Sequence, residues 1–195
     1  MINPIELKKK YLQSREKLFS SLLNSNDGVT FNKNHTILVD SVVKDLVLGI
    51  QRQFPVSDFS LIAVGGYGRQ DLSPKSDVDL LFLYKKSNKN IRGFITALNN
   101  SLWDLGLEVG ISFLTLKQVI IDSKKDIKTV TKFAESRHLI GDEDYYGEFV
   151  RSIKILIGKL NSLKLSEKKL LELVGRHDYY LGIKSNLEPQ IKEGI

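Results

Sequence analysis

With 195 residues, 42% of them hydrophobic, the chain is long enough to bury one core with an added extension. Its net charge of +6 suits phosphate-rich ligands, but the basic residues are too dispersed to favour a nucleic-acid-binding protein. The sequence contains no cysteine, which excludes disulfides and thiolate metal sites, and no apolar run approaches the about 18 residues needed to cross a membrane. We therefore predict a cytoplasmic protein that does not act at a membrane.

Two helices are predicted before the first strand. A charged helix is expected from Pro4 to about Leu23, with loosely periodic apolar residues. The segment from Asn24 to Asn34 is rich in Asn, Ser and Gly, and we expect a loop there. Apolar residues then recur at helical spacing from Thr36 to about Arg52, so the second helix should lie against a sheet and end before Pro55.

The most informative stretch runs from Phe59 to Tyr84. Its first part is apolar up to Val64 and stops at Gly65 and Gly66, as a buried strand does when it ends in a tight turn. The second part begins with Asp77-Val78-Asp79 and continues as an apolar run, which predicts a second buried strand with two acids at its start. Because side chains alternate along a strand, the two carboxylates should point to the same side, about 6 to 7 Å apart.

The paired acids and the glycine turn together predict a metal–nucleotide site. Like charges on one face are costly unless a cation lies between them, and Mg²⁺ takes one or two carboxylates together with phosphate oxygens. Gly65, Gly66 and Gly68 leave backbone N–H groups open to a phosphate, while Arg69 and Lys75 add positive charge. Each motif alone is often only a turn or a solvated strand end, but their succession on two neighbouring strands favours a functional site.

The remaining segments are expected to be one strand and several helices. A helix from Ile91 to Leu105 should end at Gly106, and a third strand should run from Leu107 to Leu114. Helical patterns follow in the rest of the chain, at Asp126 to Leu139, Glu143 to Leu160 and Ser166 to Lys184.

These motifs resemble a known family. The segments Gly65-Gly66-Tyr67-Gly68-Arg69, Leu72-Ser73-Pro74 and Ser76-Asp77-Val78-Asp79-Leu80-Leu81 are similar to the nucleotidyltransferase domain of the bacterial PII uridylyltransferase/uridylyl-removing enzymes, within the DNA polymerase beta-like superfamily. The likeness continues through Leu102 to Gly110, Glu135-Ser136-Arg137 and Leu187-Glu188-Pro189. The first 58 residues carry little of it.

The resemblance implies an α/β (α+β) fold of the polymerase beta-like type, with a mixed sheet and flanking helices. We expect an N-terminal helix and loop over residues 1–35, the nucleotidyltransferase core over 36–120 and a helical extension over 121–195. Members of the family continue into a His-Asp hydrolase domain and ACT domains, and the 195 residues of this chain are too few to include them. We therefore expect a fragment of a longer protein, truncated at its C-terminus.

The implied reaction transfers a uridylyl group from UTP to a tyrosine of the PII nitrogen-regulatory protein and releases pyrophosphate. By the same resemblance, Asp77 and Asp79 would hold two Mg²⁺ ions, and Gly65, Gly66, Gly68, Arg69 and Ser76 would bind the nucleotide. A nucleotidyltransferase with a small-molecule or RNA acceptor, or a non-catalytic regulatory module that binds proteins, would carry the same motifs, and both alternatives stay open.

At three further positions, a functional role and a purely structural role are both compatible with the sequence. Glu108 matches the third acid of the superfamily and by that resemblance would be a third catalytic metal ligand, although an exposed acid on an edge strand would look the same. The positions just after it that are polar in the family are Ile111 and Leu114 here. Arg137 would reach the phosphates if its helix covers the site, or else pair with Glu135 or Asp142. The dipeptide His177-Asp178 lacks the other ligands of a His-Asp metal site, and we expect no metal there.

Overall fold

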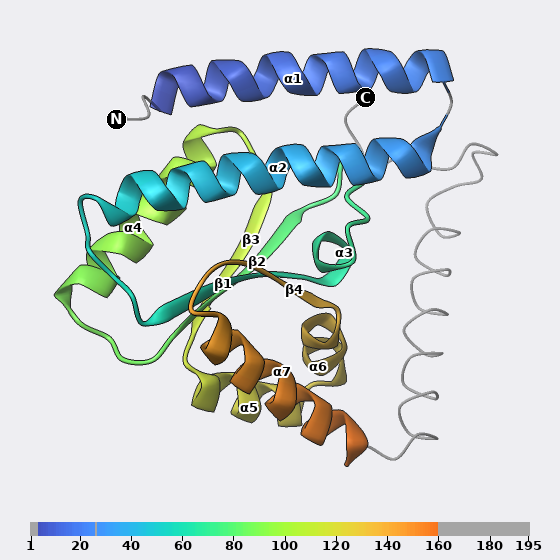
Figure 1. Ribbon diagram of the computed structural model, residues 1–195. Helices are drawn as coiled ribbons and strands as arrows, with labels where there is room; N and C mark the ends of the chain where they lie inside the picture. The colour runs from blue at the N-terminus through green and yellow to red at the C-terminus, as the bar shows by residue number, and fades with distance from the viewer. Residues whose placement is uncertain (1–3, 26, 160–195) are drawn as a thin grey trace, which may run out of the picture.

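A four-stranded sheet lies at the centre of the computed structural model, which describes residues 4–25 and 27–159 (Figure 1). In sheet order the strands are β3 (Val109–Leu114), β2 (Val78–Tyr84), β1 (Phe59–Val64) and β4 (Ser136–Gly141). β1 is antiparallel to β2 and β4, whereas β2 and β3 are parallel. The prediction of a mixed sheet with flanking helices is confirmed.

Helices cover both faces of this sheet (Figure 1). One face packs against α2 (Gly28–Gln51) and α4 (Lys89–Asp104), with α1 (Pro4–Ser25) lying along α2. The other face packs against α5 (Leu116–Lys125), α6 (Ile127–Ala134) and α7 (Glu143–Gly158). Because strand side chains alternate, β2 sends Leu80 and Phe82 into the first core and Leu81 and Leu83 into the second. The central strands are therefore mostly apolar, with Asp79 near the start of β2 as an exception, because the sheet is buried on both faces.

The loop predicted from Asn24 to Asn34 is wrong. α2 begins at Gly28, and the Asp27 carboxylate caps it by accepting a hydrogen bond from the Thr30 N–H at 3.0 Å. The Asn- and Gly-rich composition concealed this cap, and Phe31 is buried one helical turn further on. The second helix thus begins within the segment that was expected to be a loop.

The helix predicted from Asp126 to Leu139 is also wrong in its second half. α6 ends at Ala134, and residues 136–141 form β4 along the free edge of β1, with a change of register between Leu61 and Ile62. Gly141 closes this strand at a φ of +109°, where a side chain would collide with the Phe59 carbonyl. The segment after residue 120 is therefore not wholly helical, since it supplies one strand of the sheet.

α5 was not predicted, although a capping box marks its start. The Thr115 hydroxyl accepts from the Gln118 N–H while the Gln118 side chain accepts from the Thr115 N–H. The predictions of β1, β2, α4 and α7 are confirmed, and β3 begins two residues later than expected. The expected helix from Ser166 to Lys184, with His177 and Asp178, lies outside the described residues, and the division of the chain at residues 35 and 120 stays a prediction. Among the described helices, none combines the length and apolar character needed to cross a membrane.

Candidate active site

The glycine turn forms a single helical turn, α3 (Gly65–Gly68), directly after β1. Gly65 adopts a φ of +62°, which glycine reaches without strain, and its carbonyl accepts from the Arg69 N–H at 3.0 Å. At Gly68 a Cβ would collide with the Glu135 carbonyl, so this position admits only glycine. Gly66 has ordinary space for a side chain, and its carbonyl accepts from the Asp71 N–H at 3.0 Å.

Asp79, the second residue of β2, lies against this turn. A Cβ on Gly65 would be 3.6 Å from Asp79 Oδ2, and a Cβ on Gly110 of β3 would be 2.8 Å from Asp79 Oδ1. The carboxylate therefore lies between two glycines, one in the turn and one in β3, and neither has a side chain to occupy the space beside it. The structure brings together the turn and one of the two predicted acids.

A lysine that the sequence did not single out provides the positive charge at Asp79. Lys132 Nζ of α6 lies 2.7 Å from Asp79 Oδ1, and the two side chains are 39% and 32% exposed. The Lys132 ammonium thus already occupies a cation position at Asp79, beside glycines that leave the space open. Its donor set is carboxylate oxygen, which suits a hard divalent ion, so these residues could hold Mg²⁺.

The other predicted residues of the motif lie around this centre. Asp77 is exposed and directly precedes β2. Ser76 is half-buried, and its N–H donates to the Ser73 carbonyl at 3.1 Å. Arg69 is exposed and forms an ion pair with Glu135, so the positive charge expected near the turn is already paired.

Glu108 does not join Asp77 and Asp79 in the structure. It is exposed, lies one residue before β3, and its carbonyl accepts from the Val78 N–H at 2.7 Å. Together with Arg15 it borders a cavity of about 380 Å³ between α1 and the loop before β2. Among the described residues, no group of three or more His, Cys, Asp or Glu side chains could hold a metal ion.

Arg137 follows neither of the two expectations for it. Its guanidinium binds the Asp40 carboxylate of α2 with both ends, at 2.6 and 3.0 Å, and donates to the Tyr67 carbonyl at 3.3 Å. The same guanidinium lies 5.6 Å from the centre of the Tyr67 ring. Arg137 of β4 therefore links α2 to the glycine turn, and the described contacts of its guanidinium are with Asp40 and Tyr67.

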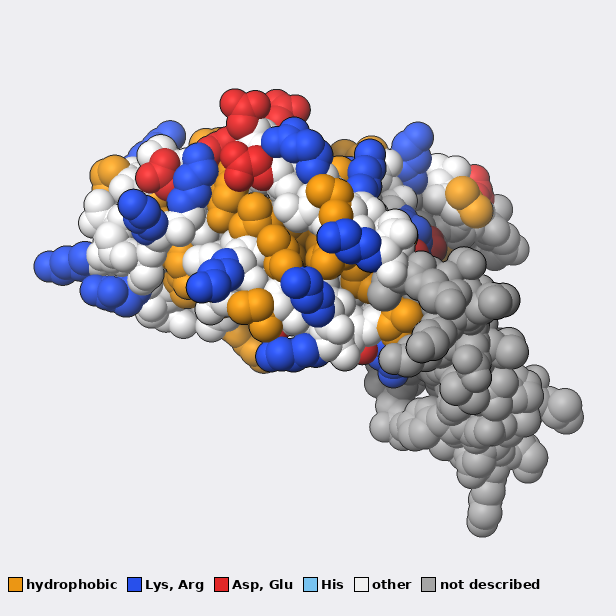
Figure 2. All heavy atoms as spheres, turned by 90° about the horizontal axis from the view of Figure 1, so that it is seen from below, with side chains coloured by type: hydrophobic (Ala, Val, Ile, Leu, Met, Phe, Trp, Pro, Cys, Tyr) orange, Lys and Arg blue, Asp and Glu red, His pale blue; other side chains and the backbone are white. Residues whose placement is uncertain are grey.

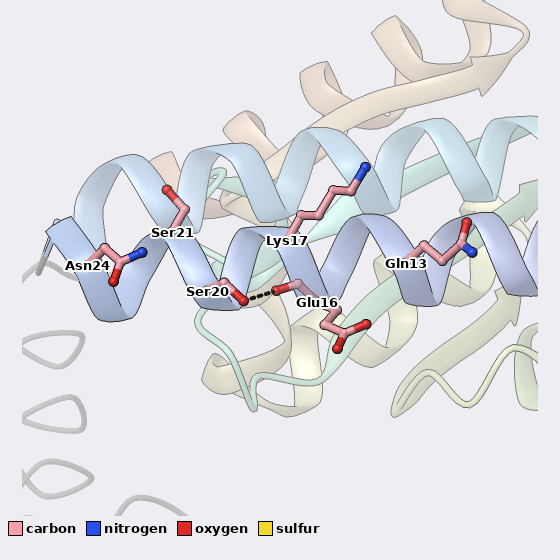
Figure 3. A pocket seen from close by; sticks show the side chains of 6 residues that line it. All are labelled: Gln13, Glu16, Lys17, Ser20, Ser21 and Asn24. Atoms are coloured by element: carbon pink, nitrogen blue, oxygen red, sulfur yellow. Dashed lines mark hydrogen bonds between the residues drawn. The ribbon is translucent and has the colours of Figure 1, made fainter.

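A hollow of about 820 Å³ lies beside α1 and carries none of these motifs. Its six lining side chains all come from that one helix, and Figure 3 shows them along it, with the Ser20 hydroxyl donating to the Glu16 carbonyl at 3.0 Å. On the opposite side of the molecule, basic side chains of α5 and α7 are scattered among apolar ones (Figure 2). Neither surface competes with the Asp79 site as a candidate.

Comparisons with known proteins agree with this geometry. The family described as "Nucleotidyltransferase domain" matches residues 43–144, which include the glycine turn and both acids. Proteins named bifunctional uridylyltransferase/uridylyl-removing enzyme are similar to the chain. That of Ralstonia nicotianae is 35% identical over 81% of the chain and 18% of the relative, and that of Idiomarina loihiensis is 34% identical over 93% and 22%.

The chain thus spans about a fifth of the length of these relatives. A solved toxin–antitoxin structure with AMP-PNP overlaps at a TM-score of 0.37 and 16% identity, over 67% of this chain and 96% of that one, which is too distant to bear on function. The family match itself covers more than half of the chain. The chain therefore belongs to the nucleotidyltransferase domain family.

Proposed function

We propose that this chain is the transfer domain of a uridylyltransferase, moving a uridylyl group from UTP to a tyrosine hydroxyl of a PII-type regulatory protein. The observation that carries the proposal is the closeness of the glycine turn to Asp79, since a Cβ on Gly65 would lie 3.6 Å from Asp79 Oδ2. The backbone of the turn would bind phosphate, and the carboxylate beside it would bind metal. The names of the relatives support uridylyl as the transferred group. The removal of uridylyl that those names also state is not part of this proposal.

Asp79 and Asp77 would hold two Mg²⁺ ions. Bound there with the triphosphate, the ions would neutralise developing charge and lower the pKa of the attacking hydroxyl. Gly65, Gly66 and Gly68 would let phosphate oxygens approach the backbone, with Ser76 and Arg69 at the edge of the site. The tyrosine oxygen would bond to the α-phosphorus as the bond to the β-phosphate oxygen breaks, releasing pyrophosphate and passing the hydroxyl proton to solvent.

A transfer assay tests this function. The protein is incubated with Mg²⁺, a PII homologue and each of four labelled nucleoside triphosphates in turn. We expect label on the PII protein from UTP alone. Label on a small molecule or RNA instead would indicate another acceptor, and no label from any nucleotide would overturn the proposal.

One observation favours a second candidate, a protein-binding module with a residual site. Within residues 4–25 and 27–159, no three-acid metal group is formed, and Glu108 is exposed outside the strand. In the catalytic proposal Glu108 would join Asp77 and Asp79 as a third carboxylate once metal is bound, whereas the second candidate gives it no role.

Replacing Glu108 separates these two functions. Glu108→Gln should leave the melting temperature unchanged, because the side chain is exposed. If Glu108 joins the two acids when metal binds, the same variant should lower the transfer rate at least about tenfold through loss of a charged metal ligand. Glu148→Gln, an exposed acid of α7, is the matched control and should transfer at the wild-type rate. A Glu108 variant with wild-type turnover would remove this residue from the site.

A further inference from the structure

The ion pair between Lys132 and Asp79 joins a residue of α6 to the centre of the proposed nucleotide site. We propose that Lys132 is a resident counter-ion of Asp79, that metal with nucleotide displaces it, and that its ammonium then binds the triphosphate. This inference rests on the proposed function, since it adds a substrate-binding residue to the same site. Neither the glycine turn nor the Asp-Val-Asp motif includes Lys132.

α6 holds Lys132 in a fixed place. The Asp126 carboxylate caps this helix by accepting from the Lys128 and Thr129 N–H groups at 3.1 and 3.2 Å. Val130 and Phe133 are buried in the core beneath the sheet. The backbone next to Lys132 is therefore anchored on both sides, so only the side chain needs to move.

The path of the Lys132 side chain follows the glycine turn. A Cβ on Gly65 would lie 3.7 Å from Lys132 Cγ, which places the aliphatic part of the lysine against the turn before its ammonium reaches Asp79. A phosphate bound at the turn would consequently lie within reach of the same ammonium. A lysine ammonium on a flexible four-carbon chain can move from one oxygen to another without any change in the backbone.

Charge explains the exchange. Without metal, Asp77 and Asp79 are two like charges at the start of an apolar strand, and the Lys132 ammonium offsets one of them. A divalent ion supplies twice that charge to the same carboxylate, so it replaces the ammonium when both compete for Asp79 Oδ1. The arriving triphosphate is strongly negative, and the released ammonium becomes one of its ligands.

The pair differs from two other partly exposed ion pairs in the carboxylate that it covers. Arg69 with Glu135 and Lys85 with Asp142 join neighbouring segments through acids that belong to neither motif. Lys132, by contrast, occupies the carboxylate that the glycine turn faces.

Lys132→Met tests the inference because it removes the charge and keeps a similar unbranched side chain. Two affinities are measured on the whole chain: Mn²⁺ alone by electron paramagnetic resonance, and UTP with Mg²⁺ by calorimetry. We expect Mn²⁺ to bind about two- to fivefold more tightly, since its competitor in a partly exposed pair is gone. UTP with Mg²⁺ should bind at least about tenfold more weakly, since a charged phosphate ligand is lost.

Two further variants act as controls. Lys154→Met removes an exposed lysine from α7 and should change neither affinity, while Lys132→Arg retains the charge and should bind Mn²⁺ like the wild type. Unchanged affinities in Lys132→Met would make the pair purely structural and overturn the inference, and unchanged UTP affinity alone would overturn its phosphate-binding half. If wild-type protein bound Mn²⁺ but no UTP, the proposed function would fail while the counter-ion half would still be judged by Mn²⁺ binding.

Discussion

At the scale of single residues, two arginines near the glycine turn are paired in very different surroundings. Arg137 and its partner Asp40 are 22% and 14% exposed, whereas Arg69 and Glu135 are 49% and 44% exposed. Removing one partner of a shielded pair strongly destabilises the fold, because the remaining charge is neither paired nor fully hydrated. An exposed pair contributes little to the free energy of unfolding.

We therefore expect Arg137→Met to lower the free energy of unfolding by about 3 kcal/mol and Arg69→Met by less than about 1 kcal/mol. Both variants remove the same group, so the comparison isolates the effect of burial. Chemical denaturation of the two variants measures it. Equal losses would show that the Arg137 clamp does not hold α2, β4 and the turn together.

His35 is the buried residue whose charge should make stability depend on pH. It is 4% exposed, and its Nδ1 lies 3.1 Å from the Leu72 carbonyl in the loop that follows the turn. Burial lowers the pKa of His35 below its usual value, and the carbonyl only partly opposes this. As the pH falls below about 6.5, His35 binds a proton in the unfolded chain but not yet in the folded one. The free energy of unfolding is therefore highest above that pH and decreases below it.

We expect the free energy of unfolding to decrease from pH 7 to pH 5 and His35→Gln to flatten that dependence. Burial also lowers the pKa of His138, so His138→Gln is measured in parallel to separate the two contributions. The His35 ring signals, followed by NMR, should titrate below the usual histidine range. A ring that titrates at or above pH 6.5 would contradict the assignment.

At the scale of elements, glycine has opposite consequences in a helix and in the turn. Gly49 lies within α2 with open space around its missing Cβ, whereas Gly68 is packed against the Glu135 carbonyl, where β4 begins. Glycine in a helix costs about 0.5–1 kcal/mol relative to alanine, but a backbone clash forces two elements apart.

Gly49→Ala should therefore raise the melting temperature by about 1 to 4 °C, and Gly68→Ala should lower it by more than that. Thermal unfolding of both variants checks the pair. A neutral Gly68→Ala would show that α3 and β4 are not in contact in solution.

Elements set by local patterns could be predicted from the sequence, and those set by distant partners could not. β1 and β2 are apolar runs, and α4 has apolar residues at helical spacing. Gly65 marks the end of β1, and Gly106 marks the end of α4. β4 forms because one edge of β1 is free to pair with it. The sequence of residues 136–141 has no pattern that indicates a strand. α5 was missed although Thr115 and Gln118 carry a capping signal.

At the scale of the whole molecule, the site joins segments that are far apart in the chain. The glycine turn and the acids are separated by one loop, so their proximity follows from two adjacent strands. Lys132 is 53 positions from Asp79, and Arg137 is 97 positions from Asp40. Those contacts arise from the packing of helices on both faces of the sheet, and no spacing within the sequence encodes them.

We expect Asp77 and Asp79 to hold divalent metal beside a nucleotide at the glycine turn. The most direct test is anomalous diffraction from crystals of the protein grown with Mn²⁺ and a non-hydrolysable UTP analogue. We expect a manganese peak about 2.0 to 2.6 Å from a carboxylate oxygen of Asp79, with the triphosphate along the glycine turn and Lys132 turned toward it. A triphosphate bound elsewhere, or an Asp79 carboxylate still paired with Lys132 and carrying no manganese, would contradict it.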